Sequence, residues 1–134
     1  MNGVATTPAA DHLFKTRSDT HKLNKERTEL FYRVTAQILF LAQLSRPDLQ
    51  TAISFLTTRI GEDKTDKDDY KKLTRVAKYM RKTNFLRLTI EAKYLDQNHW
   101  FINAAFAVYN NIQSHTGAYA TFGKGMINGS AKGK

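Results

Sequence analysis

The chain has 134 residues, of which 41% are hydrophobic and 25% charged, a composition that suits one folded domain or a domain with part of a second. It has no cysteine, which excludes disulfides, thiolate zinc sites and thiol nucleophiles, and no run of eighteen apolar residues that could span a membrane. The formal charge of +9 predicts a polyanionic partner, nucleic acid before acidic membrane surfaces, with a merely soluble basic protein as the alternative.

Residues 1–24 are polar and show no repeating pattern, apart from one apolar pair at Leu13 and Phe14. We expect this leader either to pack on the rest of the protein or to hang free. Its first part lacks the apolar centre of a signal peptide, which predicts an intracellular location, cytoplasmic or nuclear.

Residues 25–83 predict three helices. Apolar residues recur at steps of three and four from Lys25 to Leu44. Pro47 then suits the first turn of a second helix, which should end near Ile60 before a glycine. The third helix should run from about residue 66 to 82, and Thr65 with Asp68 predicts a capping box at its start.

The third helix carries five bases at steps of four, four, three and four, which places them on one face, opposite the apolar one: Lys67, Lys71, Arg75, Lys78 and Lys82. A solvated face normally mixes charges of both signs, whereas the acids here are confined to residues 66–69. A line of one sign suits a phosphate backbone. The stripe is therefore the candidate nucleic-acid site, and an ordinary solvated face is the competing interpretation.

After residue 83 the pattern changes to the alternation of strands, in residues 86–92, 99–108 and 118–127. The stretch 98–108 should form a hairpin with 114–127. The sequence thus predicts an α+β chain with a leader at 1–24, a helical part at 25–83 and a strand part at 84–134.

Sequence motifs for chemistry are absent. The histidines, at positions 12, 21, 99 and 115, lack the spacing of metal ligands, and the serines lack a nucleophile-elbow context. The tripeptide at Gly123–Gly125 is too short for a phosphate loop and predicts a bend or bulge instead. We therefore expect no catalytic residue, metal ligand or cofactor.

Three stretches in this order, SRPDLQTAISFLTTRI, DDYKKLTRVAKYMRKTNFLRLTIEA and WFINAAFAV with SHTGAYATFGKGMI, resemble the Pol polyprotein of Ty1/copia-type retrotransposons. The similar region, about residues 7–131, is the end of the reverse transcriptase and the start of its RNase H. The resemblance implies a three-helix bundle like the thumb and connection, which grip a primer–template duplex, followed by an incomplete RNase H-like antiparallel sheet.

In that family the strand after the tryptophan usually reads W-x-V-D-A-S/A, and its aspartate is the first metal-binding carboxylate of the nuclease. Here Asn103 follows Trp100 at that position, so the resemblance implies a lost carboxylate, with an ordinary polar residue as the alternative. Tyr109 and Asn111 also replace a usual histidine and a common aspartate. The family uses Mg²⁺ held by several carboxylates. The others would lie beyond residue 134, and the polymerase aspartates would lie upstream of residue 1.

We therefore expect a non-catalytic fragment similar to this reverse transcriptase/RNase H region, which binds RNA–DNA or DNA duplex backbones without reading their sequence. The family itself is an RNA-directed DNA polymerase and ribonuclease H. Two alternatives stay open: a segment of an active Pol polyprotein that works only with the missing palm and nuclease segments, and a domesticated protein-interaction module. A degenerate reading frame without a function fits the first interpretation equally well. No membrane partner is expected, but an exposed strand edge around Tyr119–Ile127 should allow self-association.

Overall fold

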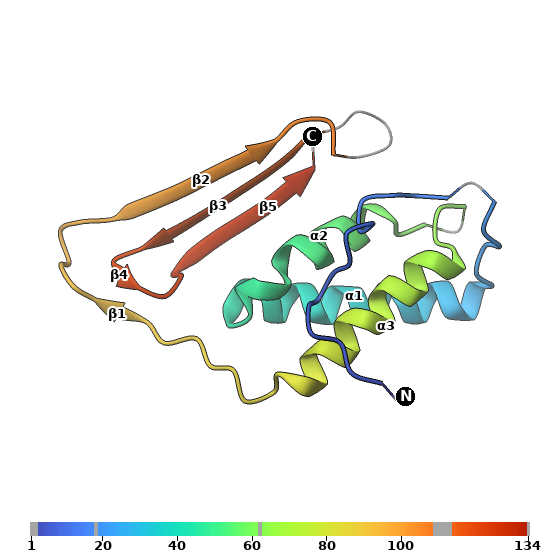
Figure 1. Ribbon diagram of the computed structural model, residues 1–134, viewed down its shortest axis with the longest axis horizontal. Helices are drawn as coiled ribbons and strands as arrows, with labels where there is room; N and C mark the ends of the chain where they lie inside the picture. The colour runs from blue at the N-terminus through green and yellow to red at the C-terminus, as the bar shows by residue number, and fades with distance from the viewer. Residues whose placement is uncertain (1–2, 18, 62, 109–113, 134) are drawn as a thin grey trace.

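The computed structural model describes residues 3–17, 19–61, 63–108 and 114–133. Three helices pack together, and a three-stranded antiparallel sheet lies beside them (Figure 1). The fold class is α+β, as predicted. None of the helices in these ranges has the length and apolar character needed to cross a membrane.

The three predicted helices are all present. α1 spans Lys25–Leu44, a 3₁₀ turn η1 (Pro47–Leu49) leads into α2 (Gln50–Thr58), and α3 spans Lys67–Lys82. Asn24 caps α1 by accepting a hydrogen bond from the backbone nitrogen of Arg27 at 3.1 Å. The spacing of apolar residues thus predicted the positions of the three helices closely.

The predicted capping box of α3 is wrong by one residue. The carboxylate of Asp66 accepts hydrogen bonds from the backbone nitrogens of Asp68 and Asp69, at 2.8 and 2.9 Å. Asp69 returns the contact by accepting from the backbone nitrogen of Asp66 at 3.3 Å. Thr65 instead donates its hydroxyl hydrogen to the carbonyl of Arg59, and this hydrogen bond closes the loop before the helix.

The hydrophobic core lies among the helices and includes the leader. Phe31, Ile53, Leu56 and Val76 are almost completely buried there. Ala5 and Leu13 of the leader are also buried, so of the two expectations for this segment the packed one is correct. The leader, dark blue in Figure 1, crosses α3.

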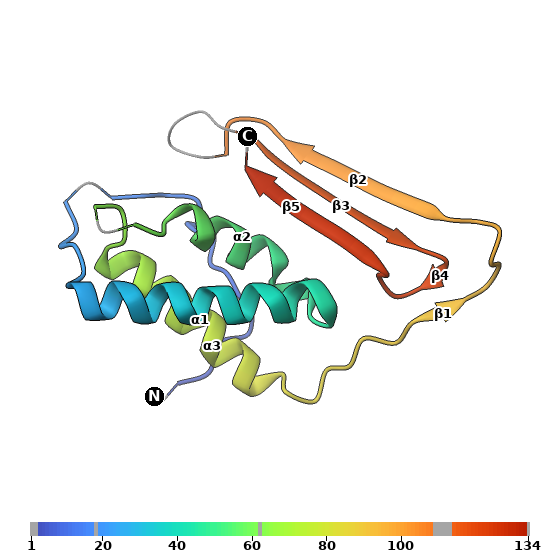
Figure 2. The same cartoon turned by 180° about the vertical axis from the view of Figure 1, so that it is seen from behind.

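The sheet has the order β2-β3-β5, formed by β2 (His99–Ala105), β3 (His115–Thr121) and β5 (Asn128–Gly133). β2 and β3 pair antiparallel from His99↔Thr121 to Ala105↔His115, which confirms the predicted hairpin. β5 was not predicted as a strand. It lies beside α2, and within this sheet β2 is the strand farthest from the helices (Figure 2).

The strand predicted at residues 86–92 is largely wrong. Only β1 (Glu91–Ala92) is a strand, and it pairs with β4 (Gly123–Lys124) in a separate two-stranded sheet. Gly125, at φ +77°, follows β4, and a Cβ there would collide with the carbonyl oxygen of Thr89. Glycine at this bend therefore lets residues 86–90 run close beside it.

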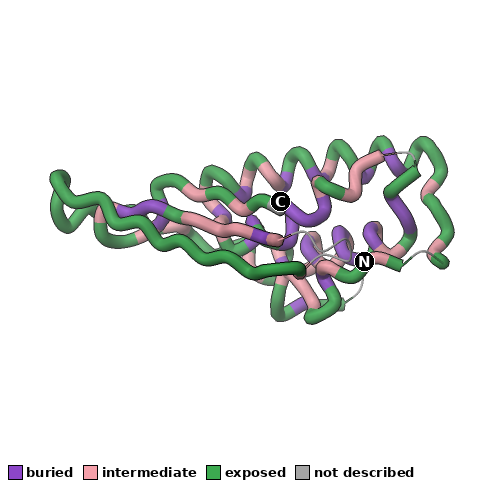
Figure 3. The backbone as a smooth tube through the Cα atoms, turned by 90° about the horizontal axis from the view of Figure 1, so that it is seen from above, coloured by how far each residue is buried: buried purple, intermediate pink, exposed green. Residues whose placement is uncertain are grey.

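The exposed edge predicted around Tyr119–Ile127 is wrong for the first part of that range. β3 is the central strand, and Tyr119 and Ala120 pair on both sides, so these two residues are not an edge. β2 and β5 are the edge strands of this sheet, and β5 lies beside α2, whereas all seven residues of β2 are exposed. Figure 3 shows the contrast between a strand exposed along its length and buried residues gathered among the helices. Apolar side chains of β2, among them Trp100, Phe101 and Ile102, are uncovered.

Candidate nucleic-acid interface

The exposed surface of α3 is exclusively basic. This helix is described in full, and its exposed residues are Lys67, Lys71, Arg81 and Lys82. From Lys67 to Lys82 the helix rises about 22 Å, which is long enough to follow several phosphates of one strand. Within the described part of the chain, no carboxylate forms a salt bridge with the three lysines.

The acids at the start of α3 do not offset these bases, because each is held by a partner inside the fold. The carboxylate of Asp68 pairs with the Lys72 ammonium at 3.0 Å, and that of Asp69 pairs with the Arg59 guanidinium at 3.1 Å. Burial would raise the pKa of Asp66, but hydrogen bonds from the backbone of Asp69 and the hydroxyl of Thr20 outweigh it and lower the pKa. Burial raises the pKa of Asp69, against the attraction of Arg59.

The leader covers the middle of the predicted stripe, which the sequence did not indicate. The Arg75 guanidinium donates to the carbonyl and hydroxyl oxygens of Thr7, at 3.2 and 3.0 Å. A Cβ placed on Gly3 would lie 3.1 Å from the ammonium nitrogen of Lys78. Arg75 and Lys78 are consequently half-buried. Of the five bases on the predicted stripe, these two are therefore partly covered, while Lys67, Lys71 and Lys82 are exposed.

Lys72 was not singled out from the sequence, although it is a second basic residue of α3 that binds the leader. Its ammonium is buried, donates to the carbonyl of Lys15 at 2.6 Å and lies 5.1 Å from the ring centre of Phe55. Lys72 stands one position outside the five-base stripe, beside the apolar Leu73. That position was a usable signal for a buried base.

Arg46 is a second missed residue, and it joins α3 to η1. Its guanidinium forms a fork on Asp48, with distances of 2.9 and 2.8 Å, and donates to the carbonyl and hydroxyl oxygens of Thr83 at 3.1 and 2.8 Å. It also lies 5.7 Å from the ring centre of Tyr79. This cluster fixes the C-terminal end of α3, where Lys82 is exposed.

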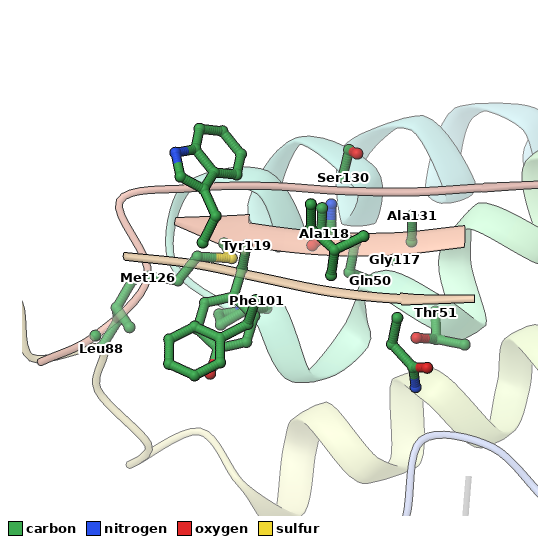
Figure 4. Close-up of a pocket in the computed structure, with 15 residues that line it drawn as sticks. Gln50, Thr51, Leu88, Phe101, Gly117, Ala118, Tyr119, Met126, Ser130 and Ala131 are labelled. Atoms are coloured by element: carbon green, nitrogen blue, oxygen red, sulfur yellow. The ribbon is translucent and has the colours of Figure 1, made fainter. Parts of the chain in front are cut away.

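Asn103 lies away from α3, in β2, paired with Gly117 and exposed to solvent. It lines an open groove of about 880 Å³ between the sheet and α2, with Gln50 and Thr51 on the helical side (Figure 4). The rings of Phe101 and Tyr119 stack in this groove with centres 4.7 Å apart.

No cluster of three histidines or acids that could hold a metal ion occurs among the described residues, at Asn103 or elsewhere. The histidines are not brought together: His12, His21 and His99 are exposed, whereas His115 is buried and its pKa is lowered by that burial. Tyr109 and Asn111 lie outside the described residues. An amide with this setting can accept or donate hydrogen bonds, but it brings no charge for binding a cation.

Comparison of the chain with protein-family models, curated proteins and solved structures finds no match. The resemblance to the copia-type Pol region consequently stays a prediction from the residues quoted for it.

Proposed function

We propose that the chain binds nucleic acid through its phosphate backbone, without reading sequence, and that it does not catalyse a reaction by itself. The observation that carries this proposal is the basic surface of α3, whose exposed residues are all lysine or arginine. In the copia-type resemblance, this helix would belong to the part that grips a duplex. An intracellular location, where such duplexes occur, belongs to the same proposal.

The chemistry of this surface is electrostatic. Lysine ammonium groups on a rigid helix neutralise phosphates and release counterions, so binding weakens steeply as salt rises. Base-specific contacts would need side chains placed to form paired hydrogen bonds with base edges. The exposed residues of α3 include two neighbouring cations at its end and two separate lysines, an arrangement that suits a backbone. RNA–DNA hybrid and DNA duplex are therefore both expected to bind.

The absence of catalysis is part of the proposal and follows from Asn103. Hydrolysis of RNA by two metal ions requires several carboxylates around them. The amide at this position contributes no formal charge, and the groove beside it contains neutral polar groups from Gln50 and Thr51. We expect no Mg²⁺ to be held there.

The proposal can be tested with two triple variants of equal charge. The first changes Lys67, Lys71 and Lys82 to Glu, and the control changes three exposed bases outside α3 to Glu: Lys25, Arg33 and Lys93. Each substitution subtracts two charges, so both variants have a net charge of +9 − 6 = +3. The difference between them therefore reports position rather than total charge.

Binding to a mixed-sequence hybrid should be measured by fluorescence anisotropy over a range of salt concentrations, with thermal melts to verify folding. The α3 variant should lose affinity. The negative slope of log K against log salt should become less steep by about 3, roughly one for each lost phosphate contact. The control variant should lose less affinity and keep a steeper salt dependence. Equal losses in the two variants, or binding that is insensitive to salt, would contradict the assignment to α3.

A further inference from the structure

β2 is an edge strand of seven residues, and its outer side is unpaired. β3 occupies one side of β2, and none of the strands in the described part of the chain occupies the other. Side chains along this strand are uncovered, with Trp100 55%, Phe101 51% and Ile102 71% exposed. A row of open backbone donors and acceptors recognises one kind of partner, another extended strand.

β2 lacks the features by which proteins protect such an edge. Residues 99–105 contain no lysine, arginine, aspartate, glutamate or proline. Its pairing with β3 proceeds without a bulge through seven consecutive residues. Edge strands usually carry an inward-pointing charge, a proline or a bulge that prevents pairing between copies. On a chain of net charge +9, this uncharged strand is a surface where two copies can approach without direct repulsion between side chains.

We propose that two copies of the chain pair through β2, antiparallel and related by a two-fold axis at Ile102, to form a continuous six-stranded sheet. A two-fold axis perpendicular to the sheet keeps each side chain on the same face. Because faces alternate along a strand, the axis must lie where one residue pairs with its own equivalent in the second copy. Ile102 is the centre of His99–Ala105, so an axis at this residue lets all seven residues of one strand pair with the seven of the other. The pairing would add about six to eight backbone hydrogen bonds.

The side chains of β2 complement themselves in this register. Trp100 lies opposite Ala104 of the second copy, so the large ring meets a small side chain on the same face. Phe101 lies opposite Asn103 on the other face, and Ile102 meets its own equivalent. Cross-strand neighbours of this kind lie within contact distance. The inference goes beyond nucleic-acid binding, because it uses neither α3 nor its bases.

The first test measures the oligomeric state of the full chain without nucleic acid, by sedimentation at several concentrations. The wild-type chain should form a dimer that tightens as salt rises, because salt screens the repulsion between two copies of net charge +9. Nucleic-acid binding should respond in the opposite sense, so failure of either proposal can be recognised separately. A chain that is monomeric at all concentrations would overturn the dimer.

Ile102→Lys provides the specific disruption, since it places two ammonium groups directly opposite each other. The dimer should weaken at least about tenfold. Ile90→Lys is the matched control: Ile90 is 58% exposed and lies outside the strands, so it has the same chemistry without the pairing. An Ile102→Lys chain that dimerises as tightly as the Ile90→Lys chain would overturn the proposal.

The register can be tested by cross-linking, because the chain has no cysteine of its own. At the axis, the two Cα atoms would lie about 4.5 to 5.5 Å apart, within the range of a disulfide. Ile102→Cys should therefore form a dimeric disulfide rapidly under mild oxidation, while Ala104→Cys, two residues from the axis, and Ile90→Cys should not. Faster cross-linking of Ala104→Cys than of Ile102→Cys would overturn the assigned axis.

Discussion

Replacing Arg46 by methionine should lower the free energy of unfolding by about 3 kcal/mol. The guanidinium is buried and donates four hydrogen bonds, two to Asp48 and two to Thr83. A hydrogen bond to a charged group contributes roughly 1.5–3 kcal/mol, but the bonds of one fork are not additive. The Asp48 side chain is 32% exposed, so water recovers part of the loss. Methionine keeps much of the stem that packs beside Tyr79.

The pH dependence gives this prediction a second readout. Burial would raise the pKa of Asp48, but hydrogen bonds from Arg46 and Tyr79 outweigh burial and lower the pKa. A carboxylate whose pKa is lowered by folding stabilises the protein fully at pH values above its unfolded-state pKa. This stabilisation is lost as the pH falls through the folded-state pKa. The difference between wild type and Arg46→Met should therefore narrow below about pH 4.

Urea unfolding followed by circular dichroism, at neutral pH and at several acidic pH values, measures both effects. Arg46→Lys is the control, because it keeps the positive charge but cannot form the fork. Its loss should lie between those of wild type and Arg46→Met. A loss below about 1 kcal/mol for Arg46→Met, or a difference that does not change with pH, would refute the assigned role of this cluster.

Three further predictions concern the leader, the cap of α3 and Asn103. Removing residues 1–10 should uncover Arg75 and Lys78 and raise affinity for a hybrid about tenfold, measured by anisotropy; unchanged affinity would show that these bases do not contact the ligand. Asp66→Ala should cost about 2 kcal/mol in urea unfolding because it removes both cap bonds, and Asp66→Asn should cost less; equal losses would contradict this explanation. Asn103→Asp should change stability by less than about 0.5 kcal/mol because the position is exposed, and a labelled hybrid with Mg²⁺ or Mn²⁺ should stay uncut; cleavage abolished by a chelator would overturn the non-catalytic proposal.

The helices could be predicted from the sequence because their determinants are local. Apolar residues at steps of three and four, Pro47 at the first turn of its helix and acids at the start of α3 all act within a few residues of one another. The error in the capping box has a similarly local cause. Thr65 and Asp66 are both good caps, and the choice depended on the loop in which Thr65 bonds to Arg59.

The strands and the interface were less predictable because their contacts are distant in sequence. Residues 86–90 alternate like a strand, yet no described strand pairs with them, and alternation alone does not supply a partner. β5 has the sequence NGSAKG, which lacks β-branched and aromatic residues, and it forms because β3 offers an edge beside α2. The coverage of Arg75 depends on Thr7, which no local pattern relates to it.

The leader's position across α3 also determines when the helical part can be completed during synthesis. Thr7 and Arg75 are 68 residues apart, and Lys15 and Lys72 are 57 apart. A ribosome adding about 5–20 residues per second needs roughly 3–14 seconds to pass from Thr7 to Arg75. The hydrogen bonds from Arg75 to Thr7 and from Lys72 to Lys15 can therefore form only after α3 has been made, although the leader precedes α3 in the chain. Proteases and chaperones that act on nascent chains should therefore meet the leader before these hydrogen bonds to α3 have formed.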